Sequence, residues 1–121
     1  MRLTHVNLEL PAGAEDEARW FYGDLLGLRE IPKPEALRDR GGVWFDAGGL
    51  DLHFSAVRGD RLPDVQRHTG LECEDVDTVS ALLTGAGVSL DQGRPAPWKR
   101  VFVHDPFGNR LELHEPGVFR N

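Results

Sequence analysis

Near its C-terminal end the chain reads Asp105-Pro106-Phe107-Gly108-Asn109-Arg110-Leu111-Glu112-Leu113-His114. The first five residues are typical of a tight reversal, because proline fixes φ and glycine adopts a positive φ without steric cost. The last four alternate, so that the two leucines would point to one face of a strand and Glu112 and His114 to the other. The sequence therefore predicts a hairpin, with strands near residues 100–104 and 109–115 joined by this turn.

The alternating pattern occurs twice in the chain. Leu50-Asp51-Leu52-His53 matches Leu111-Glu112-Leu113-His114, which lies 61 positions later. Two other segments also repeat: His5-Val6-Asn7-Leu8-Glu9-Leu10 matches His68-Thr69-Gly70-Leu71-Glu72-Cys73 after 63 positions, and Leu26-Gly27-Leu28 matches Ala86-Gly87-Val88 after 60. Three similar offsets indicate two related halves of about sixty residues, and units this short bury a core only by pairing.

Each half has the pattern of a βαβββ module. In the first half we expect strands at 3–10, 28–31, 43–47 and 50–57 and a helix at 14–26. In the second half we expect strands at 68–74, 88–91, 100–104 and 109–115, and a helix that begins after Asp75 or Asp77 and ends at Gly87. The predicted fold class is α+β, with two tandem βαβββ modules forming curved mixed sheets around a cleft. A single domain would span 1–121, with module 1 at about 1–57, a linker at 58–67, module 2 at about 68–115 and a tail at 116–121.

Composition excludes several classes of protein. The chain has 121 residues, of which 40% are hydrophobic and 28% charged, as in ordinary globular proteins. Its formal net charge of -6 disfavours nucleic acid and anionic membrane surfaces as partners. The lone cysteine, Cys73, cannot form an intramolecular disulfide, and no apolar run reaches the length of a bilayer. We expect a protein of the cytoplasm.

Potential metal ligands lie on the polar faces of the outer predicted strands. Each half offers one early histidine, His5 or His68, and a later group: Asp51 or His53 in the first half and Glu112 in the second. An exposed His or Glu on a strand is usually only solvated. Here the residue types recur in both halves, and such a mixture suits Zn, Ni, Mn or Fe. We therefore interpret these residues as candidate ligands of a divalent metal.

The motifs resemble those of the vicinal oxygen chelate superfamily, which includes glyoxalase I, fosfomycin-resistance proteins, extradiol dioxygenases and metal-free bleomycin-binding proteins. The resemblance covers nearly the whole chain. It is carried by the opening His5-Val6-Asn7-Leu8-Glu9, by the helix ending Trp20-Phe21-Tyr22 to Leu25-Leu26-Gly27-Leu28, and by Asp105-Pro106-Phe107-Gly108-Asn109-Arg110-Leu111-Glu112-Leu113.

The resemblance implies a set of metal ligands. His5, His68 and Glu112 match the superfamily positions on the first strand, at the start of the second module and on the final strand. The fourth position holds a long carboxylate in glyoxalase I, whereas here it is either the shorter Asp51 or His53. Glu112 or Asp51 is also the candidate general base.

The leading functional hypothesis is an enzyme that chelates a small oxygen-rich substrate on a divalent metal and acts as a lyase, isomerase or transferase by Lewis-acid catalysis. The alternative is a metal-free protein that sequesters a small molecule such as an antibiotic. A third hypothesis is an Fe(II) extradiol dioxygenase, whose ligands are also two His and one Glu.

Other side chains are candidates for shaping the site. Trp44, Trp98, Arg100 and Asn7 are expected to contact the substrate, and Arg100 would favour an anionic group. His104 and His114 are expected at turns or on the surface. The resemblance also implies a homodimer.

Overall fold

The computed structural model describes residues 3–58, 68–93 and 95–118. The chain divides into two compact units, Met1–Arg61 and Leu62–Asn121, called here the N-terminal half and the C-terminal half. Apart from residue 58, the linker predicted at 58–67 lies outside the described residues, as do the last three residues of the predicted tail.

The N-terminal half contains one four-stranded mixed sheet. Its strands are β1 (His5–Pro11), β2 (Arg29–Ile31), β3 (Val43–Asp46) and β4 (Asp51–Val57), in the spatial order β1-β4-β3-β2. β1 and β4 are parallel and the other neighbours antiparallel. The helix predicted at 14–26 is an α-helical turn, α1 (Glu15–Ala18), continued by a π-helical segment, η1 (Arg19–Leu25). A short 3-10 helix, η2 (Glu35–Arg40), lies in a segment without predicted regular structure.

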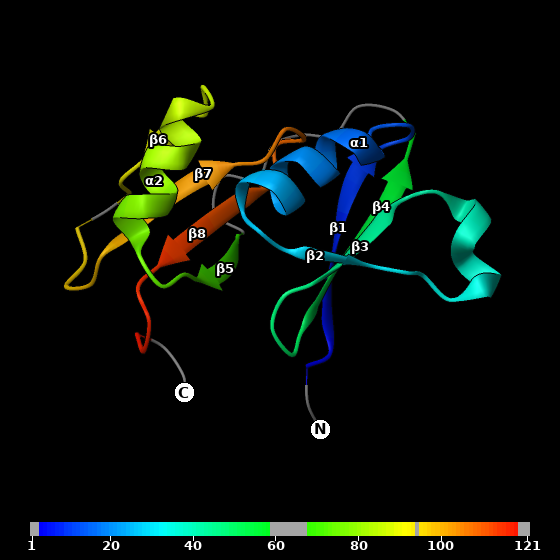
Figure 1. The fold of residues 1–121 in the computed structure, drawn as a ribbon, viewed down its shortest axis with the longest axis horizontal. Coiled ribbons are helices and arrows are strands. Elements are labelled where there is room, and N and C mark those ends of the chain that lie inside the picture. The colour runs from blue at the N-terminus through cyan, green and yellow to red at the C-terminus, as the bar shows by residue number, and fades with distance from the viewer. Residues whose placement is uncertain (1–2, 59–67, 94, 119–121) are drawn as a thin grey trace. The chain divides into compact units, whose positions relative to one another are not determined.

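The C-terminal half repeats this topology (Figure 1). Its elements are β5 (Thr69–Glu72), α2 (Val76–Gly85), β6 (Leu90–Asp91), β7 (Arg100–His104) and β8 (Arg110–His114), and the strand order is β5-β8-β7-β6. Asp75 caps α2 by accepting hydrogen bonds from the backbone N–H groups of Asp77 and Thr78. The predicted α+β fold with two βαβββ modules is confirmed.

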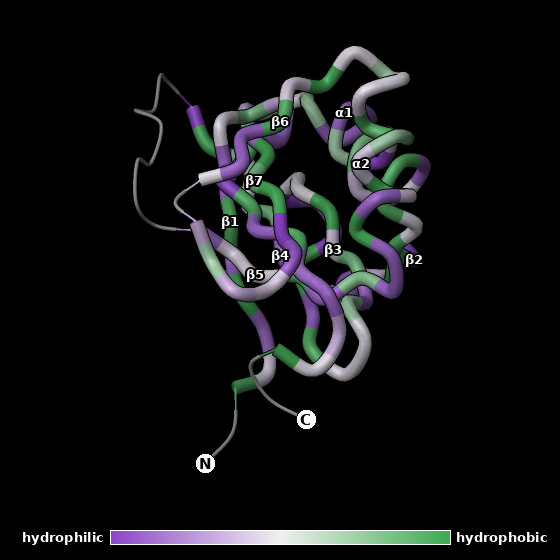
Figure 2. Tube along the Cα trace, turned by 90° about the vertical axis from the view of Figure 1, so that its left-hand side faces the viewer, coloured by the Kyte–Doolittle hydropathy of each residue, from purple (hydrophilic) through white to green (hydrophobic). Residues whose placement is uncertain are grey.

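One face of each sheet forms a core against its helix. In the N-terminal half the helical segment packs on β3 and β4, with the Tyr22 ring centroid 5.8 Å from that of Phe45 and 4.7 Å from that of Phe54. The buried set is Ala18, Phe21, Tyr22, Val43, Phe45, Leu52 and Phe54. In the C-terminal half the buried set is Val76, Leu83, Val101, Val103, Leu111 and Leu113. Burying a side chain of this size contributes about 1.5–3 kcal/mol. Apolar and polar residues alternate along the strands, as the colours of Figure 2 show. The other face of each sheet, called here the polar face, carries the polar residues of this alternation together with Trp44 and Phe102.

The turn between β7 and β8 is held by a buried pair of polar side chains. The carboxylate of Asp105 accepts hydrogen bonds from the backbone N–H groups of Phe107 and Asn109, at 2.9 and 2.8 Å, and from Nδ2 of Asn109 at 2.7 Å. The predicted reversal is confirmed, and it fixes how β8 pairs with β7.

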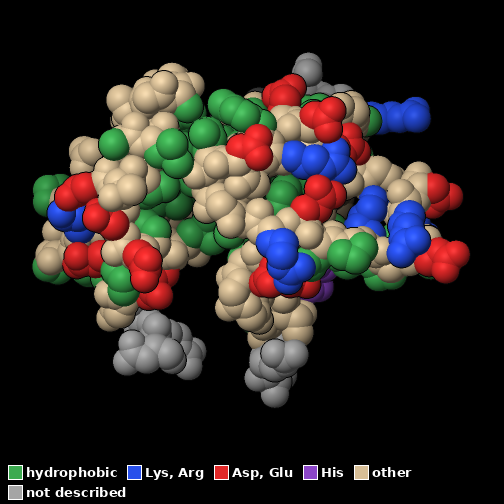
Figure 3. Space-filling view, viewed as in Figure 1, with side chains coloured by type: hydrophobic (Ala, Val, Ile, Leu, Met, Phe, Trp, Pro, Cys, Tyr) green, Lys and Arg blue, Asp and Glu red, His purple; other side chains and the backbone are tan. Residues whose placement is uncertain are grey.

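The surface carries side chains of both charges. In the part of the chain that the structure describes, no helix has the length and apolar character needed to cross a membrane. On the face drawn in Figure 3, acidic and basic side chains are interspersed rather than segregated.

Candidate functional site

Strand register shows which residues of the two halves are equivalent. Gly27 and Gly87 both follow the helix of their half, with φ of 77° and 84°. Ile31 and Asp91 are each the fourth residue after that glycine. Ile31 pairs with Trp44, and Asp91 pairs with Phe102. Trp44 and Phe102 are therefore equivalent positions.

The same register continues across the next strands. Trp44 pairs with His53 on β4, and Phe102 pairs with Glu112 on β8. His53 in turn pairs with Asn7, two residues after His5, and Glu112 pairs with Gly70, two residues after His68. Backbone pairing thus makes His53, not Asp51, the counterpart of Glu112, and it makes His5 the counterpart of His68.

In the N-terminal half, three aromatic rings are stacked on the polar face. The His53 ring lies between those of Trp44 and His5, with centroid distances of 3.6 and 4.3 Å and interplanar angles of 6° and 18°. Oδ2 of Asp51 is 3.6 Å from Nε2 of His53. Nε2 of His53 is buried and has no hydrogen-bond partner among the described residues. It is therefore a buried nitrogen with the Asp51 carboxylate just beyond hydrogen-bond distance.

Burial lowers the pKa of His53 below its ordinary value of 6.5, and the neighbouring His5 adds to this effect, while Asp51 partly opposes it. This lowered pKa favours the neutral form of the ring. A neutral imidazole is the form that binds metals, because ligation requires a nitrogen lone pair.

A cavity of about 590 Å³ opens beside this stack within the N-terminal half. Its lining combines the three rings with polar and basic side chains; the residues are His5, Asn7, Lys33, Leu37, Arg40, Gly41, Trp44, His53, Phe54, Ser55 and Ala56. No acidic residue is among these lining residues. Asn7 accepts a hydrogen bond from the Ser55 hydroxyl at 3.0 Å. The cavity suits a small molecule with an apolar body and an anionic group.

In the C-terminal half the central group is Glu112, whose side chain is only 4% exposed. Its Oε1 lies 3.4 Å from Nε2 of His68, and its Oε2 accepts a hydrogen bond from Nη1 of Arg100 at 3.0 Å. The His68 ring also packs edge-on against Phe102. The two oxygens of the carboxylate therefore face different partners.

The spacing of this pair fits a shared metal ion. Ligand atoms held about 2.0–2.2 Å from one metal are roughly 3.0–3.4 Å apart at octahedral and tetrahedral angles. Nε2 of His68 and Oε1 of Glu112 match that spacing. In neither half, over residues 3–58, 68–93 and 95–118, do three or more His, Cys, Asp or Glu side chains form a group able to hold a metal. The structure brings His68 together with Glu112, and His53 together with His5 and Asp51.

Sequence reasoning missed some residues of these faces and misjudged one. Lys33 and Arg40 line the N-terminal cavity, although only their position in a charged, irregular segment pointed to it. His104 is exposed as expected. The expectation for His114 was wrong: it is buried, and its Nδ1 lies 2.9 Å from the carbonyl oxygen of Glu115. His114 lies on the same face of β8 as Glu112, and this end of the face is buried rather than exposed to solvent.

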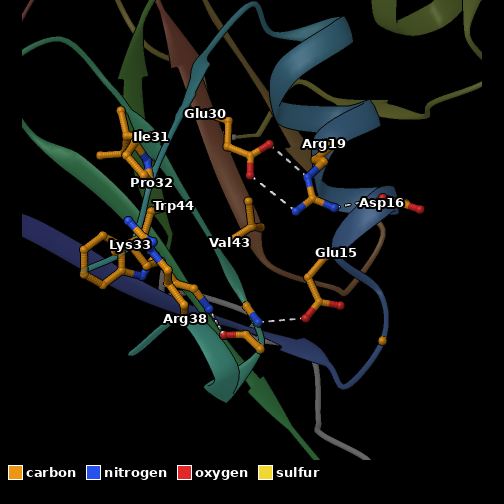
Figure 4. A pocket seen from close by; sticks show the side chains of 13 residues that line it. Glu15, Asp16, Arg19, Glu30, Ile31, Pro32, Lys33, Arg38, Val43 and Trp44 are labelled. Carbon is orange, nitrogen blue, oxygen red and sulfur yellow. Dashed lines mark hydrogen bonds and ion pairs between the residues drawn. The ribbon is translucent and has the colours of Figure 1, made fainter. Parts of the chain in front are cut away.

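A second cavity of the N-terminal half, about 450 Å³, is drawn in Figure 4. Several of its charged groups are paired with one another. Arg19 bridges Glu30 and Asp16, at 2.9 and 2.8 Å, and Glu15 accepts a hydrogen bond from the backbone N–H of Gly42 at 2.7 Å. The Gly42 bond also lowers the pKa of Glu15. This cavity is a structural junction between α1, η1 and the segment before β3.

Comparisons with known proteins agree with this architecture. The family model described as Glyoxalase/Bleomycin resistance protein/Dioxygenase superfamily matches residues 2–113. A protein of Arabidopsis thaliana named Glyoxylase I 4 is 27% identical over 133 residues, which cover 93% of this chain and 71% of that protein.

Solved structures show the same fold. A glyoxalase family protein from Bacillus anthracis is 38% identical, with a TM-score of 0.84 and coverage of 95% of this chain and 94% of the other. The fosfomycin resistance protein FosX from Listeria monocytogenes is 18% identical, with a TM-score of 0.77 and coverage of 98% and 95%. TnmS3, an antibiotic binding protein from Streptomyces sp. CB03234, is 23% identical, with a TM-score of 0.68 and coverage of 97% and 99%.

Proposed function

The chain belongs to the Glyoxalase/Bleomycin resistance protein/Dioxygenase superfamily, and from this premise we propose that it is a divalent-metal-dependent enzyme acting on a small, oxygen-rich, anionic substrate. The proposed ligands are His5, His68 and Glu112, with His53 as the fourth. A bound divalent ion supplies Lewis-acid chemistry, polarising a substrate carbonyl and lowering the pKa of bound water. The proposal holds whether the two donor pairs come from one chain or from two copies of it.

The observation that carries the proposal is the 3.4 Å spacing between Nε2 of His68 and Oε1 of Glu112. His53, at the position equivalent to Glu112, supports it with a buried ring nitrogen that the fold leaves without a hydrogen bond among the described residues. Unsatisfied buried nitrogens are rare in native structures and commonly mark a function. A bound metal ion would account for the His68–Glu112 spacing and would give Nε2 of His53 a partner.

The two carboxylates are proposed to have different roles. Glu112 is nearly buried, and its Oε2 accepts a hydrogen bond from Arg100, so this carboxylate is held in place as a ligand. The Asp51 side chain is 39% exposed, and it borders His53 at 3.6 Å. We assign Asp51 as the general base that takes a proton from the substrate, and Glu112 as the ligand.

Substrate charge follows from the basic residues around the sites. Lys33 and Arg40 line the cavity beside Trp44 in the N-terminal half. In the C-terminal half, Trp98, Lys99 and Arg100 line a cavity of about 300 Å³. Lys33 and Arg40 would attract a carboxylate, phosphate or phosphonate despite the net negative charge of the protein, whereas Lys99 is paired with Asp77 and Arg100 with Glu112. Trp44 and Trp98 would pack against the apolar part of the substrate.

The second candidate function is metal-free binding of a small molecule. It is favoured by the ion pair between Arg100 and Glu112, because a guanidinium already neutralises the carboxylate that a metal would need. Dioxygenase activity is a third candidate, which oxygen uptake with Fe(II) and a catechol would reveal. We further propose a cytoplasmic homodimer, whose mass light scattering would measure.

Metal titration tests the leading proposal. The protein, freed of metal with a chelator, is titrated with Co²⁺, Zn²⁺, Ni²⁺ and Mn²⁺, and bound metal is counted per chain. We expect one equivalent to bind, and His68→Ala to weaken that binding, while His104→Ala, which removes an exposed histidine at the end of β7, leaves it unchanged. Less than about a tenth of an equivalent bound by the unaltered protein would overturn the proposal and favour the metal-free binder.

A further inference from the structure

We infer that Arg100 is a positioning residue for Glu112: it occupies one carboxylate oxygen and leaves the other to bind the metal alone. This inference rests on the proposed function, since it concerns how the C-terminal donor pair meets a metal ion. It assigns to Arg100 a role distinct from contact with the substrate.

The division of the carboxylate is the first observation. Oε2 of Glu112 receives the Arg100 Nη1 hydrogen bond at 3.0 Å, whereas Oε1 is the oxygen near Nε2 of His68, at 3.4 Å. A carboxylate binds a metal through one oxygen or through both. With Oε2 engaged by a guanidinium, only Oε1 is available on the side of the histidine.

The rigidity of Arg100 is the second observation. Its side chain is 17% exposed, and its guanidinium carbon lies 4.9 Å from the ring centroid of Phe102 and 5.6 Å from that of Trp98. Cation–π contacts of this kind restrict the guanidinium plane. Phe102 pairs directly with Glu112 in the sheet, so the residue that packs on Arg100 is also the strand neighbour of its acceptor.

A hydrogen-bonding partner such as Arg100 affects both the orientation of the carboxylate and its affinity for the metal. Hydrogen bonds from neighbouring groups to metal-binding side chains orient them, and their loss typically weakens metal affinity by about 10- to 100-fold. A guanidinium that merely competed with the metal would have the opposite effect, because its removal would free Glu112 and tighten binding. The sign of the change therefore separates positioning from competition.

The test is Co²⁺ binding to the unaltered protein, Arg100→Met, Arg100→Lys and Arg110→Met, followed by visible absorption. Arg110 is the matched control: its guanidinium carbon lies 3.8 Å from the same Phe102 ring, and that ring is its contact in the structure. We expect Arg100→Met to weaken Co²⁺ affinity about 10- to 100-fold. Its d–d bands should also lose intensity, because a freed Oε2 raises the coordination number. Arg100→Lys should restore part of both properties, and Arg110→Met should leave both unchanged.

Three outcomes would overturn the inference. Tighter binding by Arg100→Met would mean that Arg100 competes with the metal. Equal affinity and an equal spectrum in Arg100→Met and the unaltered protein would mean that it has no role at the metal, while leaving the proposed function in place. Absence of Co²⁺ binding by the unaltered protein would overturn the proposed function together with this inference. Thermal melting of each metal-free variant shows whether it is folded, and Arg100→Lys retains the test if Arg100→Met is not.

Discussion

Replacement of His53 tests whether backbone register identifies the fourth ligand. His53 is the counterpart of Glu112 by strand pairing, and its Nε2 is buried without a hydrogen bond among the described residues. Structural zinc sites with four ligands have apparent binding free energies of about 10–16 kcal/mol. If one ligand of four carries about a quarter of that, its loss costs about 2.5–4 kcal/mol, or roughly a 100- to 1000-fold weaker Kd.

The assay is isothermal titration with Zn²⁺, applied to His53→Ala, Asp51→Asn and the unaltered protein. We expect His53→Ala to weaken binding by the full amount, and Asp51→Asn to weaken it by less than about tenfold, since that residue acts on His53 from 3.6 Å. His53→Gln serves as a control for packing, because it keeps much of the volume between the rings of Trp44 and His5. The reverse order of effects, with Asp51→Asn the more damaging, would refute the assignment by register.

Three further results are expected. Gly42→Ala should lower the free energy of unfolding, measured by urea titration, by at least about 2 kcal/mol. The reason is that Gly42 has φ 85° and an added Cβ would lie 2.0 Å from the Phe54 carbonyl oxygen. The control Gly48→Ala, with φ 79° and open space around the Cβ, should lower it distinctly less. Burial lowers the pKa of His53 from 6.5, so at acid pH the unfolded chain binds a proton at this residue that the folded chain does not. The free energy of unfolding should therefore fall as the pH drops below about 6.5. Thermal melts between pH 5 and 8 should show a smaller fall for His53→Gln. Burial and the charges of Asp75 and Glu72 raise the pKa of the Cys73 thiol, so mass spectrometry should find it alkylated by iodoacetamide more slowly than free cysteine at pH 8; equal rates would contradict the burial.

Sequence alone predicted the modules because their signals are local. The turn at Asp105 to Asn109, the cap at Asp75 and the helix-ending glycines Gly27 and Gly87 all depend on short-range geometry. The π-helical continuation of α1 over Arg19–Leu25 was not predicted, because its apolar spacing is nearly that of an ordinary helix.

Which residues of the two halves are equivalent could not be settled from the sequence. Matching Leu50-Asp51-Leu52-His53 to Leu111-Glu112-Leu113-His114 aligns apolar with apolar residues, but an alternating pattern also aligns with itself after a shift of two. Both shifts bury the same kind of residue, so hydropathy does not distinguish them. Strand pairing distinguishes the two alignments, because the register can be followed from the glycine that ends each helix across the neighbouring strands.

The side-chain partners of Glu112 could not have been derived from spacing. Arg100 lies on the neighbouring strand, and its reach to Oε2 depends on a rotamer set by packing on Phe102 and Trp98. The polar environment of His114 is likewise a tertiary property. Residue type and period predict the face of a strand, not what covers it.

The hairpins of the two halves differ by one residue: Ala47–Leu50 joins β3 to β4, and Asp105–Asn109 joins β7 to β8. A slip of one residue turns every side chain of a strand to the other face of its sheet, so hairpin length and strand register are linked. Here Trp44 pairs with His53 and Phe102 with Glu112, so the same faces are kept in both halves. The extra residue is therefore absorbed within the turn, and the register position that holds an imidazole in one half holds a carboxylate in the other.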